Sequence, residues 1–107
     1  MALGFPEARR MALVEAARAL ARDATSAARE SIAFSAEWSF YHGVETAALH
    51  VLRPEVSTVR EGTAWLDAEE PAFREGFLQG AAVLATAASA AEPPLRLRLP
   101  EPPRTPA

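Results

Sequence analysis

The chain has 107 residues and a formal net charge of −3 at pH 7, which fits one small, mildly acidic domain. This acidic balance argues against a nonspecific nucleic-acid binder, which would carry a basic patch or stripe, and the absence of cysteine excludes disulfides and thiolate metal sites. Lysine and asparagine are also absent, so every positive charge is arginine; we attribute this bias first to a GC-rich genome and second to selection for bidentate anion contacts.

The N-terminal residues 1–10 predict no signal peptide, because no apolar stretch follows a basic segment there. The longest run of small and apolar residues, 80–91, is shorter than the ~20 residues that span a bilayer. We therefore expect a cytoplasmic protein with no membrane partner.

A first helix is predicted over 7–24, with Pro6 at its start. Polar residues at 23–26 are suited to end this helix and to cap another one. Because this stretch holds no Gly or Pro, one continuous helix over 7–52 is the alternative. Such a helix would be about 69 Å long at 1.5 Å per residue, and it would imply a coiled coil or an extended dimer. The apolar stripe of the first helix is Leu13, Ala17, Leu20 and Ala24.

The segment 32–52 holds both histidines, and it predicts a helix that ends near Arg53 because Pro54 cannot continue it. This helix is apolar over most of its circumference, which is typical of a central helix or an oligomer interface. Gly43 lies inside it and costs about 1 kcal/mol against alanine, so we expect a neighbouring element to approach closely there. Its aromatic residues, assigned to the core or to a self-interface, are Phe34, Trp38, Phe40 and Tyr41.

Glu37 and Glu45 fall on the apolar side of this helix, where unpaired charges are costly. Three interpretations follow from that position. They form ion pairs with Arg18 or Arg22 of the first helix, they lie at the edge of the apolar side, or they act as a paired acid and base with raised pKa values.

Two further helices are expected after Pro54. Thr58 and Glu61 have capping-box spacing before a short helix over 59–68. Pro71 suits the first position of a last helix that runs to about residue 91. We interpret Gly76 and Gly80 in that helix as a notch for an aromatic neighbour such as Trp38. The large apolar residues assigned to the core or self-interface in this helix are Phe73, Phe77 and Leu84.

Proline dominates the C-terminal segment 92–107, which cannot be helical and should be extended. Leucine and arginine alternate strictly inside it, so one face is apolar and the other is basic. Such a segment packs on its own bundle as a strap, binds a partner, or is a disordered end; we favour the first two. The residues assigned to partner binding are Leu95, Arg96, Leu97, Arg98 and Leu99.

An alternative metal or small-ligand site combines the carboxylates and imidazoles of the 32–52 helix. Diiron bundles use Glu-x-x-His pairs on two helices, whereas this chain has the reversed order, His-x-x-Glu, only once. A dimer axis would supply a second pair. The four residues of this alternative site, which would take a divalent metal, are Glu37, His42, Glu45 and His50.

The sequence carries no pattern typical of nucleophilic catalysis. There is no cysteine, no serine lies in a nucleophile-elbow context, and the glycines are too scattered to cradle phosphate. We therefore favour a non-enzymatic protein.

Together these patterns predict an all-α bundle of three or four helices over 1–91, with a central aromatic-rich helix and an extended proline-rich tail over 92–107. Because alanine is abundant, the core buries little area per residue, and we expect a homodimer. The expected function is interaction or assembly, as an accessory subunit, an adaptor or a phage-type structural component that also uses its tail for contacts. The metal or small-ligand bundle is second, and a helical nucleic-acid-binding domain is third.

Overall fold

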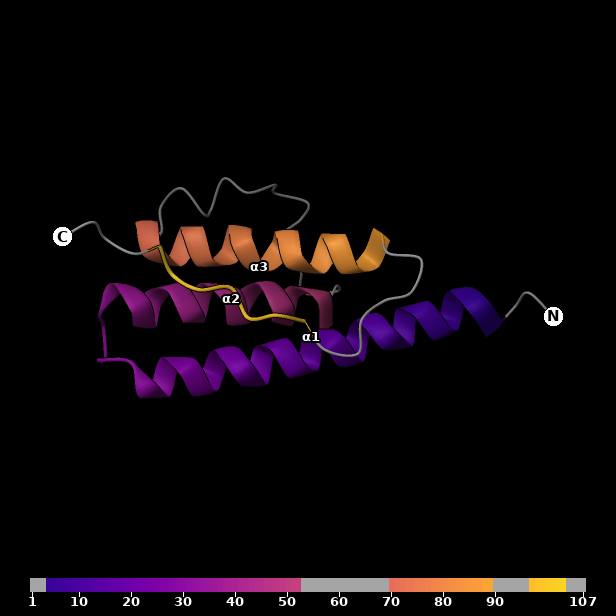
Figure 1. The fold of residues 1–107 in the computed structure, drawn as a ribbon, viewed down its shortest axis with the longest axis horizontal. Helices are drawn as coiled ribbons and strands as arrows, with labels where there is room; N and C mark the ends of the chain where they lie inside the picture. Colours follow the sequence, from indigo (N-terminus) through magenta and orange to yellow (C-terminus); the bar gives the residue numbers. More distant parts are fainter. Residues whose placement is uncertain (1–3, 53–69, 90–96, 104–107) are drawn as a thin grey trace.

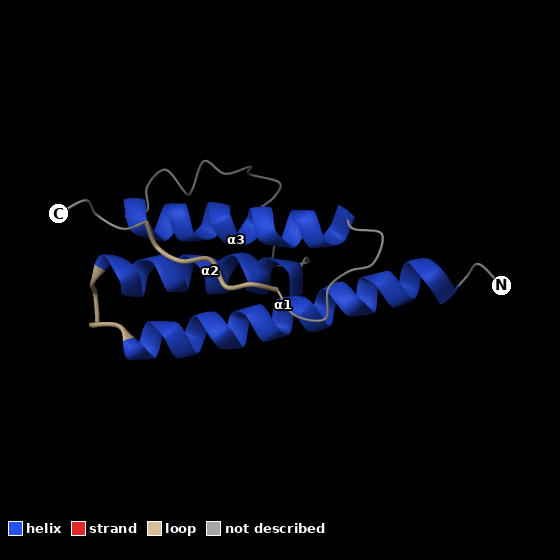
Figure 2. Cartoon of the chain, viewed as in Figure 1, coloured by secondary structure: helices blue, strands red, loops and turns tan. Residues whose placement is uncertain are grey.

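The computed structural model describes residues 4–52, 70–89 and 97–103, and their regular structure consists of three helices. These are α1 (Gly4–Glu30), α2 (Ala36–Leu52) and α3 (Pro71–Ser89). No strand occurs within the described residues (Figure 2). The prediction of an all-α chain is therefore confirmed, while the short helix expected over 59–68 lies outside the described residues.

α2 lies between the other two helices and packs extensively on both, whereas α1 and α3 share few contacts (Figure 1). α1 runs antiparallel to α2, and α3 runs in the same direction as α2. The N-terminal part of α1 extends beyond the ends of α2 and α3. No helix in the described part of the chain is long and apolar enough to cross a membrane.

α1 continues through 23–26, so the break predicted there is wrong. The Thr25 hydroxyl lies 2.8 Å from the carbonyl oxygen of Ala21 in the preceding turn, a contact that a helix accommodates. Neither Gly nor Pro interrupts the stretch, and the buried stripe of Ala17, Leu20 and Ala24 holds it against the bundle. Packing therefore outweighs the capping preference of these polar residues.

The chain reverses in a turn at 31–35, so a continuous helix over 7–52 is also excluded. Ser35 caps α2: its hydroxyl oxygen accepts from the Trp38 amide at 3.2 Å, and its carbonyl accepts from the Ser39 amide at 3.0 Å. Phe34, directly before the cap, has a φ of 65°, which is unusual for a bulky side chain. The helix consequently begins at Ala36 rather than at residue 32.

Glycines allow the backbones of α2 and α3 to touch. A Cβ added to Gly76 would overlap the carbonyl oxygen of Phe40 and lie 2.8 Å from its carbonyl carbon, and one added to Gly43 would lie 2.7 Å from the Phe77 amide nitrogen. Gly43 therefore serves the close approach that its position predicts. Gly76 faces the α2 backbone at Phe40 rather than the Trp38 ring, so the predicted notch for Trp38 is wrong.

The core is built mostly from small residues, and its largest fully buried side chains are Phe40, Leu20 and Val44. Leu84 of α3 joins them, and so does Leu97 from the C-terminal segment, which is only 6% exposed. The described tail residues 97–103, which we call the strap, run along the bundle over α1 and α2 toward the start of α3 (Figure 1). The apolar side of the strap therefore belongs to the same core as the helices.

Candidate functional site

An apolar surface follows the outward side of α2 and the turn before it. Ile32 and Phe34 are each 82% exposed, and Leu49 is 42% exposed. The Phe34 and Trp38 ring centroids are 4.9 Å apart, and those of Trp38 and His42 are 4.3 Å apart. Residues 38, 42 and 49 share one helix face by their spacing. We call this surface the outer face; its residues are Ile32, Phe34, Trp38, His42 and Leu49.

The large apolar residues that the sequence assigned to the core or to a self-interface differ in how deeply they are buried. Phe40 and Leu84 are buried in the core, and Phe77 and Tyr41 are partly buried against it. Trp38 and Phe73 are also partly buried, whereas Phe34 lies on the surface. Phe34 therefore contributes to the outer face and not to the core of this chain.

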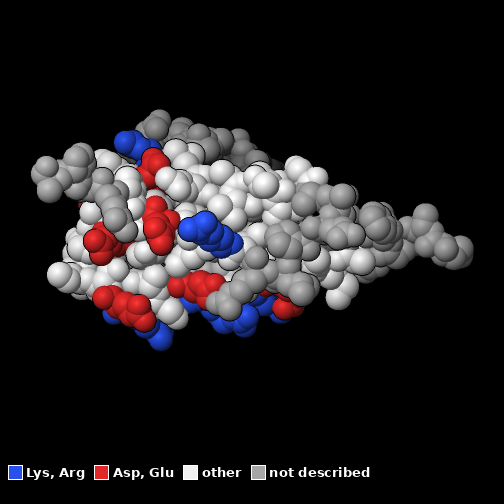
Figure 3. All heavy atoms as spheres, in the orientation of Figure 1, with Lys and Arg blue, Asp and Glu red and all other residues white. Residues whose placement is uncertain are grey.

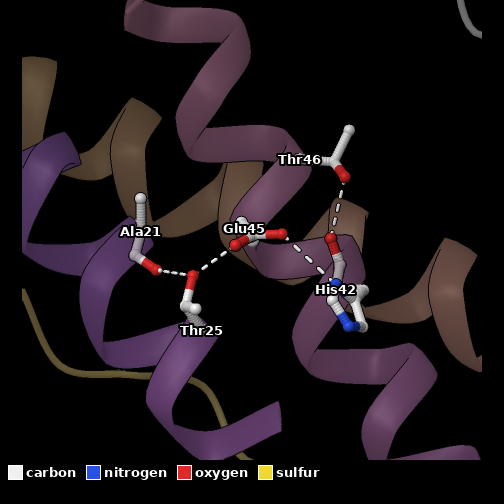
Figure 4. Close-up of polar contacts among 5 residues, drawn as sticks. All are labelled: Ala21, Thr25, His42, Glu45 and Thr46. Atoms are coloured by element: carbon white, nitrogen blue, oxygen red, sulfur yellow. Dashed lines mark hydrogen bonds and ion pairs between the residues drawn. The ribbon is translucent and has the colours of Figure 1, made fainter. Parts of the chain in front are cut away.

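A series of polar side-chain contacts connects α1 to α2 beside the outer face (Figure 4). The Thr25 hydroxyl of α1 donates to the Glu45 carboxylate of α2, and the other carboxylate oxygen lies 3.2 Å from His42 Nδ1. The Thr46 hydroxyl donates to the His42 carbonyl at 2.8 Å. Glu45, whose side chain is 24% exposed, is thus partnered by a threonine and a histidine.

Neither Arg18 nor Arg22, the arginines that the sequence offered as partners, forms an ion pair with Glu45. Arg18 instead pairs with Glu15, three residues before it on α1, at 3.2 Å. Glu37 is exposed near the start of α2, where a carboxylate is favoured by the helix dipole. Glu37 therefore lies at the edge of the apolar side.

The four residues of the alternative metal site do not come together within one chain. His42 and Glu45 are in contact, but the His50 ring packs on Phe77, with centroids 5.5 Å apart. Across the described residues, no group of three or more His, Cys, Asp or Glu side chains is placed to hold a metal ion. A shared site would therefore need further ligands from a second copy.

The strap shows the alternation that its sequence predicts. Leu97 is buried, Arg98 is exposed, and Leu99 is half-buried against the core. Leu95 and Arg96 lie outside the described residues. The described leucines thus face their own bundle, and Arg98 faces outward.

A cleft that the sequence did not predict opens where α2, α3 and the end of the strap meet. Its volume is about 970 Å³. Each of the three elements contributes one carboxylate to it, and Figure 3 shows several acidic side chains at this end of the molecule, with basic side chains beside some of them. We call this cleft the acidic groove; its lining residues are Ala36, Glu37, Phe40, Tyr41, Pro71, Ala72, Glu75, Glu101, Pro102 and Pro103.

Tyr41 reports the electrostatics of this groove. Burial raises the pKa of the Tyr41 phenol above its ordinary value of 10.0, and the charges of Glu101, Glu37 and Glu30 raise it further. Each of these effects disfavours the phenolate. Tyr41 is the only tyrosine in the chain, so its signals are specific to the groove.

We expect Glu101→Gln to lower the Tyr41 pKa without returning it to 10.0, because burial is the larger cause. The raised pKa means that the unfolded chain releases the phenol proton at lower pH than the folded chain does. The resulting stability is therefore complete below pH 10 and is lost as pH rises through the folded-state pKa. Lysine and cysteine are absent, so Tyr41→Phe should remove this alkaline decline.

Tyrosinate absorbance measures the Tyr41 pKa, and chemical denaturation at several alkaline pH values measures the decline in stability. Glu15→Gln removes an equal charge from an exposed position on α1 and serves as the control. Identical tyrosine titrations for wild type and Glu101→Gln would show that the strap carboxylate does not act on Tyr41.

No protein-family model matches this chain, and neither a curated protein nor a solved structure is significantly similar to it.

Proposed function

We propose that this chain is a small non-enzymatic interaction protein that self-associates through its outer face. The observation that carries the proposal is the 82% exposure of both Ile32 and Phe34 in one short turn. Large apolar side chains grouped at a surface favour association, because contact removes them from water. Trp38 and Leu49 extend the same apolar surface along α2.

The conformation of Phe34 supports the same conclusion. A φ of 65° costs a bulky residue of the order of 1–3 kcal/mol. The turn nevertheless holds the ring outward and in contact with Trp38, with the two ring planes tilted by 48°; aromatic pairs are worth about 0.5–1.5 kcal/mol. An exposed aromatic ring of this kind suits an anchor at the centre of an interface.

This proposal corresponds to an accessory subunit, an adaptor or a phage-type structural component acting in the cytoplasm. The tail contributes as the strap, which completes the core through Leu97 and presents Arg98 to solvent. Since only His42 and Glu45 of the four alternative ligands are in contact, no observation favours a metal site over self-association.

We expect Phe34→Asn to weaken dimerisation at least about tenfold, the effect of losing an aromatic anchor. The same substitution should not lower the free energy of unfolding of the monomer. Asparagine accepts a positive φ more readily than phenylalanine does, and this relief offsets the lost ring contact with Trp38. Sedimentation velocity over a range of concentrations measures the first effect, and urea denaturation of dilute protein measures the second.

Leu78→Asn is the control, because Leu78 is 48% exposed and belongs to α3, whereas the outer face consists of α2 residues and the turn before α2. It removes a smaller exposed apolar side chain and should leave the dimer intact. If the two substitutions weaken dimerisation equally, the interface does not lie on the outer face. A wild-type chain that remains monomeric would refute self-association.

A further inference from the structure

The acidic groove joins carboxylates that are far apart in the sequence. Glu37 comes from the first turn of α2, Glu75 from α3 and Glu101 from the strap. The only described polar contact of these carboxylates is at Glu75, where Oε1 accepts a hydrogen bond from Gln79 at 2.8 Å. The described lining includes no arginine or histidine, so no described lining residue neutralises the three carboxylates.

Between its carboxylates the groove is lined by aromatic and proline side chains. The Phe40 and Tyr41 rings are perpendicular, with centroids 5.6 Å apart, and Pro71, Pro102 and Pro103 form further parts of the lining. Aromatic rings attract cations, and proline rings offer a flat surface to an aliphatic chain. The groove therefore combines charge for a cation with apolar area for the stem that bears it.

The spacing of the carboxylates distinguishes between kinds of cation. Although the three share one groove, they are not among any group placed to hold a metal ion within the described residues. An ion such as Mg²⁺ needs its oxygens at about 2.0–2.1 Å. A longer cation that reaches separate carboxylates fits this arrangement better.

Arginine has the required chemistry among protein side chains. Its planar guanidinium presents five donors, binds carboxylates in a bidentate manner and stacks on aromatic faces. Its methylene stem packs on apolar surface while the charge stays at the edge. A groove open to solvent along one side admits such side chains from an extended segment.

We propose that the acidic groove binds an arginine-bearing extended segment of a partner protein, with a guanidinium bound by the carboxylates that line the groove together with Tyr41. The strap contributes Glu101, Pro102 and Pro103, so the groove is complete only when the strap lies on the bundle. This site shares no residue with the outer face, so the proposal for the groove does not depend on self-association.

The test is a titration of the full-length protein with the peptide acetyl-Gly-Arg-Gly-Arg-Gly-amide at low ionic strength, where surface charges are weakly screened. The ring resonances of Tyr41, the only tyrosine, report occupation of the groove. We expect a saturable shift of these resonances. Glu75→Gln and Glu101→Gln should each weaken binding by about fivefold, the upper range for an exposed ion pair.

Two controls separate the groove from general attraction to an acidic protein. Glu15→Gln, which removes an exposed charge on α1, should leave the affinity unchanged, and a peptide with lysine in place of arginine should bind several-fold more weakly. The proposal is overturned if Glu15→Gln weakens binding as much as the groove variants, if the lysine peptide binds equally well, or if magnesium chloride alone shifts Tyr41 to the same extent. Because the substituted glutamates are exposed, helicity measured by circular dichroism should not change.

Discussion

Gly76→Ala should lower the free energy of unfolding by about 3 kcal/mol, near the upper range for overpacking a core. The new methyl group would overlap the backbone carbonyl of Phe40. A backbone atom cannot rotate away as the end of a side chain does, so α2 and α3 must separate. That separation loosens the packing between α2 and α3, and the gain of about 1 kcal/mol in helix propensity offsets only part of the loss.

Gly80→Ala is the matched control, because it makes the same chemical change one turn further along α3. Its Cβ would meet the Cβ of Ala47 at 3.1 Å and the Cα of Val44 at 3.2 Å. Movements of a few tenths of an ångström relieve such contacts. We expect its free energy of unfolding to lie within about 1 kcal/mol of wild type, since helix propensity compensates.

Urea denaturation followed by circular dichroism compares the two glycine variants. If both variants have the same stability, α2 and α3 do not approach each other at Gly76 as described. A Gly76→Ala protein as stable as wild type would contradict the packing of this helix pair.

Phe40→Ala should lower the free energy of unfolding by about 3–5 kcal/mol, the usual cost of truncating a buried phenylalanine. Phe40 is only 1% exposed and is the largest of the fully buried side chains. Most of the other buried core residues are alanines, which are too short to fill the cavity. A small domain has about 5–15 kcal/mol of total stability, so this variant should be only marginally stable.

Leu49→Ala is the control for Phe40→Ala on the same helix, because Leu49 is 42% exposed. In dilute, monomeric protein its free energy of unfolding should change by less than about 1 kcal/mol. Phe40→Leu should retain more stability than Phe40→Ala, since it leaves a smaller cavity. Equal stability of the Phe40→Ala and Leu49→Ala variants would place Phe40 outside the core.

Much of the helical structure follows from local sequence signals. Pro71 starts α3 as its fixed φ predicts, and α2 ends at Leu52, just before Pro54. The turn at 31–35 was not predicted, because it contains neither Gly nor Pro. A phenylalanine with a positive φ has no sequence signature, and the cap by Ser35 is evident only once the turn is known.

The candidate sites were harder to predict than the helices. The acidic groove depends on how the beginnings of α2 and α3 and the end of the strap meet in space, and hydrophobic periodicity carries no information about that meeting. Similarly, a helical wheel places Glu45 on the apolar side but cannot identify Thr25 as its partner across α1 and α2. The close approach of α3 at Gly43 was predictable, because a glycine inside a helix is unfavourable unless a neighbouring element needs the space.

Native mass spectrometry of the untagged protein, purified without a chelator, tests the central claim of self-association most directly. It reports the oligomeric state and any bound metal in one spectrum. We expect a dimer whose mass equals two chains, because the outer face leaves large apolar side chains in water. A monomer at all concentrations would contradict self-association, and a dimer that carries stoichiometric metal would instead support a shared site built on His42 and Glu45.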